Sequence, residues 1–505
     1  MYNNKLNMMN MKKMKYILAS LFVVIGLSSC DLNIKPQTGI DAEETTTLLH
    51  IKSLVNGVYN NMTTISSYVY MRYPDYYTDL FNETSQSGNR GGFFSRWLIY
   101  YTDQDVTAIW KGYYSIIAQI NFVLERAEVA ATLNPDDKED IDALKGELYF
   151  FRGYCLHQLA LRFCQDYDPA KAENQLGVPC PTSYDPHAKL NRGTLAGTYA
   201  QILEDIKSAE ALVATPGEAD NCYVSVDAVT AFKAQVALQM HDYENASAYA
   251  KSLYNNYELI TCKEDMDAMW HHDSSTETIL QMNLTSSTLA LVGSTTYDYT
   301  YGSYNASLSD FLYTPGYVPE QWVCDLFDES DWRYGTCVSP SHIYVNKQLS
   351  KGTLLVKFKG NRDLFTSATV LTYKNMPKLF RVAEMYLIDA EAQYRTEGGD
   401  ALTPLNALRA ARGLAESAAT GEELFAEIKK ECVREFIGEG RRLFDLKRWG
   451  DGFKRDAQTG MSIVRADAAA IEKAASEVKF VWPIPQEEGS KNPNIGQQNE
   501  GYTQF

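Results

Sequence analysis

The side chains with the clearest chemical potential in this sequence are aromatic rings that alternate with polar residues in two segments. Residues 68–101 hold eleven aromatic residues and residues 297–344 hold twelve, in a chain that is 12% aromatic. The flat face of such a ring covers the axial C–H groups of a pyranose, while nearby polar groups reach its hydroxyls. The pattern predicts a sugar-binding surface with candidate contacts at Tyr73, Tyr76, Asn82, Trp97, Tyr299, Tyr301, Trp322 and Trp332.

The same rings have a second interpretation, in which they fasten long loops to a scaffold by packing into its core. For any single Tyr this structural role is the more common one. For Trp97, Trp322 and Trp332 the ligand-binding role and the structural role are about equally expected, because exposing an indole that binds nothing is costly.

A set of carboxylates in the C-terminal third offers a catalytic alternative. Glu431, Glu435 and Glu439 recur every four residues, which places them about 6 Å apart on one helix face, near the spacing of a retaining glycosidase. A general acid needs a raised pKa, and the surrounding cations keep carboxylates ionised. An ion-pair network is therefore favoured, with a surface glycoside hydrolase as the alternative. The surrounding cations are Arg434, Arg441, Arg442, Lys447 and Arg448.

The N-terminus predicts export and a lipid anchor. Four lysines precede a 12-residue apolar run, Tyr16 to Leu27, which is too short to span a bilayer and is typical of a secretory leader. The following Leu27-Ser28-Ser29-Cys30 resembles the lipobox of bacterial lipoproteins. We therefore expect removal of residues 1–29, acylation of Cys30, and a tether over residues 30–45, with several acyl chains giving a firm membrane hold.

Composition excludes several other classes of protein. The formal net charge of −17 argues against a nucleic-acid partner. Seven His and the lack of a C-x-x-C pair argue against a structural zinc site, and no cofactor is predicted. The eight cysteines after Cys30 are under 2% of the chain, so we expect small buried side chains and no required disulfide.

The apolar spacing predicts helices that come in pairs. Expected helices cover residues 48–62, 110–131, 141–163, 195–213, 226–241, 243–257, 379–394, 401–413 and 422–449. Small residues such as Ala228, Ala231 and Ala246 let paired helices approach closely, as in a tetratricopeptide unit. Such pairs stack into a superhelix, an architecture that generally binds ligands.

One domain over residues 46–505 accounts for this pattern. Its helical scaffold covers about 46–270 and 376–450, and an extended segment follows at 451–505. An irregular, partly β insert at about 271–375, with a strand-like piece at 353–358, interrupts the scaffold and is the expected ligand-binding part.

Four separated motifs carry a family resemblance. They run from Arg381 to Ala392, from Ala401 to Gly413, from Glu431 to Trp449, and from Trp482 to Pro485. In this order they resemble the RagB/SusD family of outer-membrane nutrient-binding lipoproteins. The helical N-terminal half agrees, so the resemblance spans nearly the whole chain after Cys30, and the insert is where it departs.

The resemblance implies both a fold and a role. It implies a mainly α protein with tetratricopeptide-like helix pairs, anchored in the outer membrane and facing the cell exterior as the lid of a SusC-like TonB-dependent transporter. Glycans are the usual ligands, delivered without a chemical step, and RagB-like peptide uptake is the alternative. By position, the resemblance favours Trp97, Tyr299 and Trp322 as ligand-facing rings.

Overall fold

The computed structural model describes residues 45–67, 69–290 and 297–505. The predicted leader, Cys30 and all but the last residue of the predicted tether lie outside these ranges. The second of the two units of the chain, Thr47–Phe505, is compact and holds every element described below. Within the described ranges, no helix is long and apolar enough to cross a lipid bilayer.

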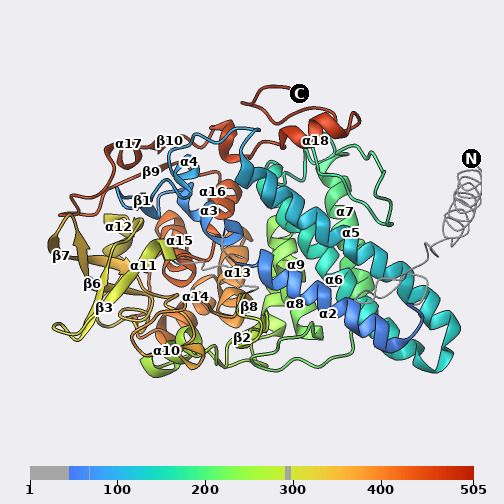
Figure 1. Ribbon diagram of the computed structural model, residues 1–505, viewed down its shortest axis with the longest axis horizontal. Helices are drawn as coiled ribbons and strands as arrows, with labels where there is room; N and C mark the ends of the chain where they lie inside the picture. The colour runs from blue at the N-terminus through green and yellow to red at the C-terminus, as the bar shows by residue number, and fades with distance from the viewer. Residues whose placement is uncertain (1–44, 68, 291–296) are drawn as a thin grey trace, which may run out of the picture. The chain divides into compact units, whose positions relative to one another are not determined.

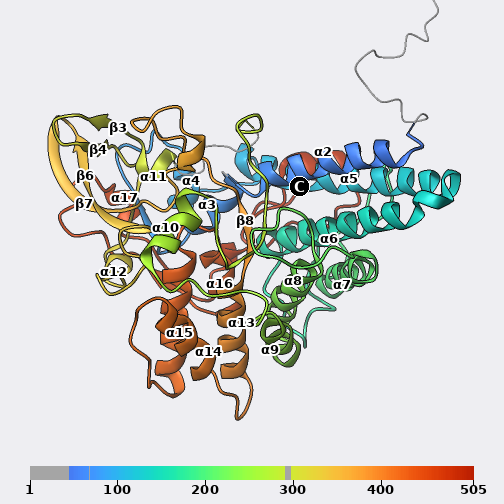
Figure 2. The same ribbon diagram turned by 90° about the horizontal axis from the view of Figure 1, so that it is seen from below.

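Long helices form the N-terminal half of the second unit. The Thr47 side chain accepts a hydrogen bond from the backbone N–H of His50 and so caps the first helix, which buries the predicted stripe at Ile51, Val55, Val58 and Met62. A short 3₁₀ turn, η2 (Pro135–Asp137), joins the helices at Gln104–Leu133 and Lys138–Phe163, which pack against each other (Figures 1 and 2). These helices are α2 (Leu48–Ile65), α5 (Gln104–Leu133), α6 (Lys138–Phe163) and α7 (Leu195–Leu212).

The predicted helix pairs continue this scaffold. Buried Ala228, Ala231 and Ala246 lie where two helices pack closely, and the later pair adds a layer to the same stack. Consecutive helices of the scaffold pack on one another (Figure 2), and the mainly helical fold matches a solved structure, so the predicted fold class is confirmed. The pairs are α8 (Val226–Gln239) with α9 (Tyr243–Ser252), and α13 (Val382–Arg395) with α14 (Leu402–Ala411).

The single helix predicted over residues 422–449 is wrong. The structure has α15 (Gly421–Phe436) and α16 (Arg442–Trp449), separated by a turn in which Gly438 and Gly440 take φ values of 80° and 77°. Backbone in that region favours glycine and ends an α-helix. Glu439 therefore lies in the turn between the helices and does not share a helix face with Glu435.

The insert contains short strands, as predicted. A four-stranded sheet runs in the order β3, β4, β6, β7, with the β4–β6 pair parallel and the others antiparallel. Its strands are β3 (Gly302–Asn305), β4 (Asp310–Tyr313), β6 (Val338–Val345) and β7 (Gln348–Leu355). Two-stranded sheets pair β1 (Phe81–Glu83) with β5 (Tyr317–Pro319), β2 (Thr278–Gln281) with β8 (Lys378–Arg381), and β9 (Phe453–Lys454) with β10 (Glu472–Lys473).

Short helices connect the strands and the long helices. The β1–β5 pairing joins the early irregular segment to the insert, so two regions far apart in sequence form one layer (Figure 1). The short helices are α3 (Val69–Tyr76), α4 (Gly92–Ser95), α10 (Lys263–His271), α11 (Tyr297–Thr300), α12 (Gln321–Cys324), η3 (Arg362–Leu364), α17 (Ala466–Ala469), η4 (Val478–Phe480) and α18 (Gln486–Lys491).

Candidate functional site

Five of the eight predicted ligand contacts are buried. The exposed fraction is 0% for Tyr76, Asn82 and Tyr299, 3% for Tyr73 and 7% for Trp97. The expectation that these side chains present a wet face is therefore wrong. In this structure they cannot stack on a ligand, and the second interpretation, in which rings fasten loops to the core, applies to them.

The buried rings form one continuous aromatic cluster. Tyr76 stacks on Tyr317 with ring centroids 3.6 Å apart, and the ring of Tyr299 lies 4.8 Å from that of Phe81. The hydroxyl of Tyr77 donates to the carbonyl of Lys479 at 2.9 Å. Because such remote partners satisfy the hydroxyls, tyrosines that alternate with polar residues can still be buried.

Trp97 supports a loop and does not form its surface. Its ring stacks on Tyr77 at 4.0 Å, and its Nε1 donates to the carbonyl of Tyr77 at 2.7 Å. Its φ of 60° is a real outlier for a bulky residue. The backbone N–H of Leu98 donates to the carbonyl of Phe93 at 2.8 Å, so Trp97 occupies the glycine position of a Schellman motif that ends α4.

Asn82 is also a structural residue. Its amide donates to the carboxyl group of Glu320, which accepts a second hydrogen bond from the backbone N–H of Asp456. Burial raises the pKa of Glu320 to about 9. These contacts fix β1 against the insert, and they leave the Asn82 side chain no face for a ligand.

Two rings do face solvent above the buried cluster. Phe93 is 47% exposed and Tyr301 is 43% exposed. The guanidinium of Arg96 lies 5.9 Å from the Phe93 ring centroid and donates to the side chain of Asn89. We call the set of Asn89, Arg90, Phe93, Arg96 and Tyr301 the Phe93–Tyr301 surface.

Charges hold the polar part of this surface in place. Arg96 donates from Nε to the carbonyl of Gly92 at 2.9 Å and lies 3.3 Å from the buried carboxylate of Glu83. A second cation, Arg465, forms a pair with Asp467 at 2.8 Å, and Asp467 lies 3.8 Å from Arg96. Glu83 and Asp467 thus pair with Arg96 and Arg465, and Arg90 is a third cation of this surface.

Three hydrogen bonds connect the segments around Arg90 and Tyr301 to the turn at residues 314–317. Thr314 donates to the carbonyl of Tyr301, Thr84 donates to the carbonyl of Gly316, and the Tyr317 hydroxyl donates to the carbonyl of Arg90. Figure 1 shows α4, β1 and α11 on the same side of the helical scaffold. The segments that hold Phe93 and Tyr301 are therefore both connected to the turn at residues 314–317.

The two remaining tryptophans are half-buried. Trp322 donates from Nε1 to the carbonyl of Asp79 at 2.9 Å, and the guanidinium of Arg442 lies 5.5 Å from its ring. Trp332 donates its backbone N–H to the carbonyl of Arg412. A ligand role for Trp322, Trp332 and Tyr301 stays a prediction.

Sequence reasoning did not single out Phe93. It counted among the aromatic residues of its segment, but Trp97 drew attention as the larger ring. The available signal was the Gly91-Gly92 pair just before it. Gly91 takes a φ of 66°, and a Cβ at this position would clash with Tyr73 and Tyr76. The chain turns at this glycine, and the Phe93 side chain that follows is exposed.

The carboxylates considered for catalysis belong to an ion-pair network. Burial alone favours the neutral form of Glu435, but the charges of Arg412, Arg381 and Arg333 outweigh it and hold its pKa well below the ordinary value. Against the same effect of burial, Arg381 and Lys357 lower the pKa of Glu439. Carboxylates held this firmly ionised are unsuited to donate a proton as general acids. Within the described ranges, no three His, Cys, Asp or Glu side chains are grouped to hold a metal ion.

Comparison with known proteins identifies the family to which the chain is related. The model of a family described as the SusD family matches residues 345–502, and a model described as "starch-binding associating with outer membrane" matches residues 32–238. A solved SusD superfamily protein from Bacteroides thetaiotaomicron is 26% identical, with a TM-score of 0.75 over 90% of this chain and 99% of that one. The chain belongs to the RagB/SusD family.

Other members of the RagB/SusD family show the same likeness. The starch-binding protein SusD of Bacteroides thetaiotaomicron is 34% identical over 160 residues, which is 30% of this chain and 26% of that relative's length. A solved SusD superfamily protein from Bacteroides vulgatus is 22% identical and has a TM-score of 0.73 over 90% of this chain and 99% of that one. This last likeness concerns the fold.

Proposed function

We propose that this RagB/SusD-family protein binds a neutral glycan at the Phe93–Tyr301 surface and leaves it chemically unchanged. The observation that carries the proposal is a pair of exposed rings beside ion-paired polar groups, on short segments that a buried aromatic cluster supports. The starch-binding relative supports a carbohydrate as the ligand. The lowered pKa values of Glu435 and Glu439 support binding over hydrolysis at that cluster.

The strength of binding follows from the two rings. Covering one ring face with a sugar buries enough apolar area for about 1 to 2 kcal/mol. Arg96 and Asn89 offer polar atoms to the sugar hydroxyls without large rearrangement, because both are already held in place. Two stacks give about 2 to 4 kcal/mol before the entropy of ordering the glycan is subtracted, which corresponds to a Kd of about 1 mM or weaker.

Titration calorimetry with the full chain tests the site. We expect a neutral oligosaccharide to bind, and Phe93→Ala or Tyr301→Ala to weaken it by roughly tenfold each, since about 1.4 kcal/mol is one factor of ten. Tyr184→Ala is the matched control, because Tyr184 is also 43% exposed but lies in a different loop. Binding that all three variants retain would show that the site is wrong.

The same titrations separate the alternatives. A panel of peptides beside the glycans tests a RagB-like peptide ligand, which would bind while every oligosaccharide failed. Incubation with oligosaccharides and measurement of new reducing ends tests hydrolysis. A steady release of product would replace the binding role with a glycoside hydrolase.

Location and delivery complete the proposal. We infer that residues 1–29 are removed, that acylated Cys30 anchors the domain of residues 46–505 through a tether in the outer membrane, and that a SusC-like TonB-dependent transporter receives the glycan. Cys30→Ser should move the protein from the membrane fraction to the soluble fraction. Co-purification of the native protein with a large outer-membrane barrel tests the transporter, and a protein that purifies alone under mild extraction would argue against it.

A further inference from the structure

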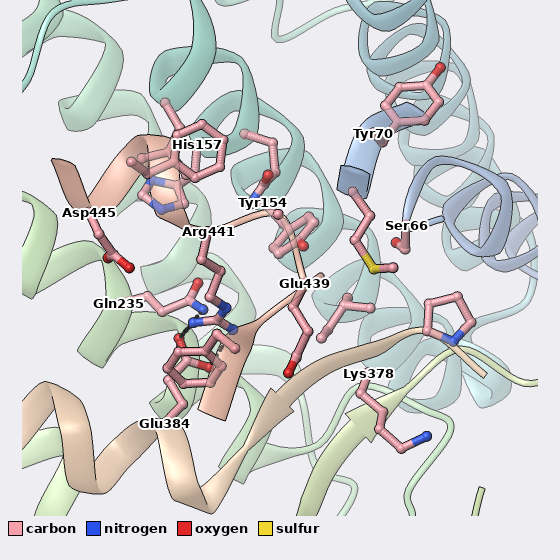
Figure 3. A pocket seen from close by; sticks show the side chains of 18 of the residues that line it. Ser66, Tyr70, Tyr154, His157, Gln235, Lys378, Glu384, Glu439, Arg441 and Asp445 are labelled. Atoms are coloured by element: carbon pink, nitrogen blue, oxygen red, sulfur yellow. Dashed lines mark hydrogen bonds and ion pairs between the residues drawn. The ribbon is translucent and has the colours of Figure 1, made fainter. Parts of the chain in front are cut away.

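A cavity of about 170 Å³ lies inside the helical scaffold, apart from the Phe93–Tyr301 surface. It lies where α6, α8 and α13 meet the turn between α15 and α16, and the two sites share no lining residue (Figure 3). Tyr70, Tyr154, Gln158 and Gln235 are half-buried at its margin, so solvent reaches it. Neither the ion-pair network nor the proposed glycan surface requires this space.

Three residues that line this cavity each hold a buried polar atom without a partner. Ser66 Oγ, Arg162 Nε and Asn375 Oδ1 accept or donate no hydrogen bond within the described structure, and Arg162 and Asn375 are 2% and 9% exposed. A buried polar group without a partner costs about 1–3 kcal/mol, so three around one cavity call for an explanation.

Their neighbours fix these atoms in place. Arg162 donates from Nη1 to the side-chain oxygen of Gln158 at 2.7 Å and from Nη2 to the carbonyl of Tyr70 at 2.6 Å, whereas its Nε has no acceptor. The Asn375 amide nitrogen donates to the carbonyl of Trp270 at 2.6 Å, whereas Asn375 Oδ1 accepts no hydrogen bond. The residues that line the cavity therefore hold one donor, one acceptor and one hydroxyl in fixed positions.

The rest of the lining is aromatic and neutral overall. Rings of Tyr70, Tyr113, Tyr154, Trp270, Phe436 and Phe444 surround the cavity. Its charged side chains comprise four cations and four anions, and pairs such as Arg441 with Glu384 already neutralise one another (Figure 3). Burial, helped by Arg162, lowers the pKa of His157 to about 3, so this imidazole stays neutral.

The volume restricts the ligand to a single ring. A dry engineered cavity of about 150 Å³ in another protein holds one benzene molecule. At about 170 Å³ this cavity has room for one six-membered ring with substituents. Apolar ring faces suit C–H groups, whereas the donor, the acceptor and the hydroxyl suit alcohols.

We propose that this cavity is a second binding site that takes one neutral, hydroxylated six-membered ring, in the form of a free monosaccharide. One ring fills the volume, and an anionic sugar would add a charge to a lining that is already balanced. The proposal does not require that the Phe93–Tyr301 surface binds glycans, because it rests on the lining of the cavity alone.

Titration of the full chain with D-glucose, D-galactose and D-xylose tests the site, with D-glucuronate as the charged probe. We expect one of the neutral sugars to bind saturably below about 10 mM and D-glucuronate to bind at least tenfold more weakly. Ser66→Ala removes one polar contact and should weaken binding several-fold. Ser53→Ala is the control, because Ser53 lies on the same helix and is exposed.

A filling variant makes the result decisive. Ser66→Trp should abolish monosaccharide binding by occupying the cavity, and Ser66→Ala keeps the test meaningful if the larger variant fails to fold. Phe93→Ala should leave monosaccharide binding unchanged, which separates this site from the proposed glycan surface. The inference is overturned if no neutral monosaccharide binds, if D-glucuronate binds best, or if binding depends on Phe93 and not on Ser66.

Discussion

Trp97 is expected to reverse the usual stability order of alanine and glycine. In an ordinary loop or helix, a glycine variant is less stable than an alanine variant by about 0.5–1 kcal/mol, because glycine loses more backbone entropy on folding. Trp97 has a φ of 60°, and left-handed backbone costs a residue with a Cβ roughly 1–2 kcal/mol. We therefore expect Trp97→Gly to be more stable than Trp97→Ala by about 1 kcal/mol.

The backbone conformation does not depend on the indole. The hydrogen bonds from Leu98 N–H to the Phe93 carbonyl and from Trp97 N–H to the Phe94 carbonyl define the turn and survive truncation of the side chain. Both variants also lose the buried indole, and the free energy of unfolding should fall by about 3–5 kcal/mol in each. The difference between the variants thus isolates the backbone term.

Urea unfolding of the full chain measures this difference, with matched variants at Leu98 as the control. Leu98 is exposed and its φ is not positive, so Leu98→Gly should be the less stable of its pair. If Trp97→Ala proves more stable than Trp97→Gly by the margin seen at Leu98, the assignment of Trp97 to a strained glycine position is refuted.

Three further perturbations test the scaffold. Glu435→Gln leaves Arg333, Arg381 and Arg412 without their shared carboxylate, so the free energy of unfolding should fall by about 3–5 kcal/mol in a urea titration, whereas half-buried Glu427→Gln should change it little. Glu320 has a folded pKa raised from 4.5 to about 9, so its contribution is full below pH 4.5 and is lost as pH rises towards 9. Unfolding measured from pH 5 to 9 should show less loss with pH in Glu320→Gln, and identical slopes would contradict this. Gly440→Ala would push a Cβ against the Met71 carbonyl and should destabilise more than Gly450→Ala, which meets open space; equal thermal midpoints would argue against that close contact.

The sequence was a good guide wherever structure depends on local spacing. The apolar stripe of Ile51, Val55 and Val58 predicts α2, because a residue every three or four positions faces the core regardless of distant partners. The same logic failed over residues 422–449. There the charged spacing continued through Gly438 and Gly440, whose positive φ values end the helix.

Burial of the aromatic residues could not be predicted from spacing. Tyr76 packs on Tyr317 from the insert, and Tyr77 donates to Lys479 near the C-terminus. Both partners lie far along the chain, so no window of sequence contains the contact. The alternation of rings with polar residues was consistent with a surface and with a core whose hydroxyls find remote acceptors, and only the tertiary fold distinguishes the two.

The end of α4 was hidden for a related reason. A Schellman motif usually places glycine after the helix, and here Trp97 takes that position. The large ring suggested a ligand contact, whereas it stacks on Tyr77 and donates from Nε1 to the Tyr77 carbonyl. Trp97, which stands where a glycine is usual, therefore supports the loop beneath the proposed site and does not itself contact the ligand.

Irregular loops present the Phe93–Tyr301 surface, and Arg455 explains how they are held rigid. Its buried guanidinium donates to the backbone carbonyls of Thr78 at 2.8 Å, Ser95 at 2.6 Å, Tyr76 at 2.8 Å and Ala468 at 2.9 Å. Carbonyls in turns and at the C-terminal ends of short helices lack intrahelical donors, and this one arginine donates to three such segments at once. Because these segments are fixed before a ligand arrives, binding need not bear the entropy of ordering them. Weak stacking on two rings is then sufficient for the affinity expected of this surface.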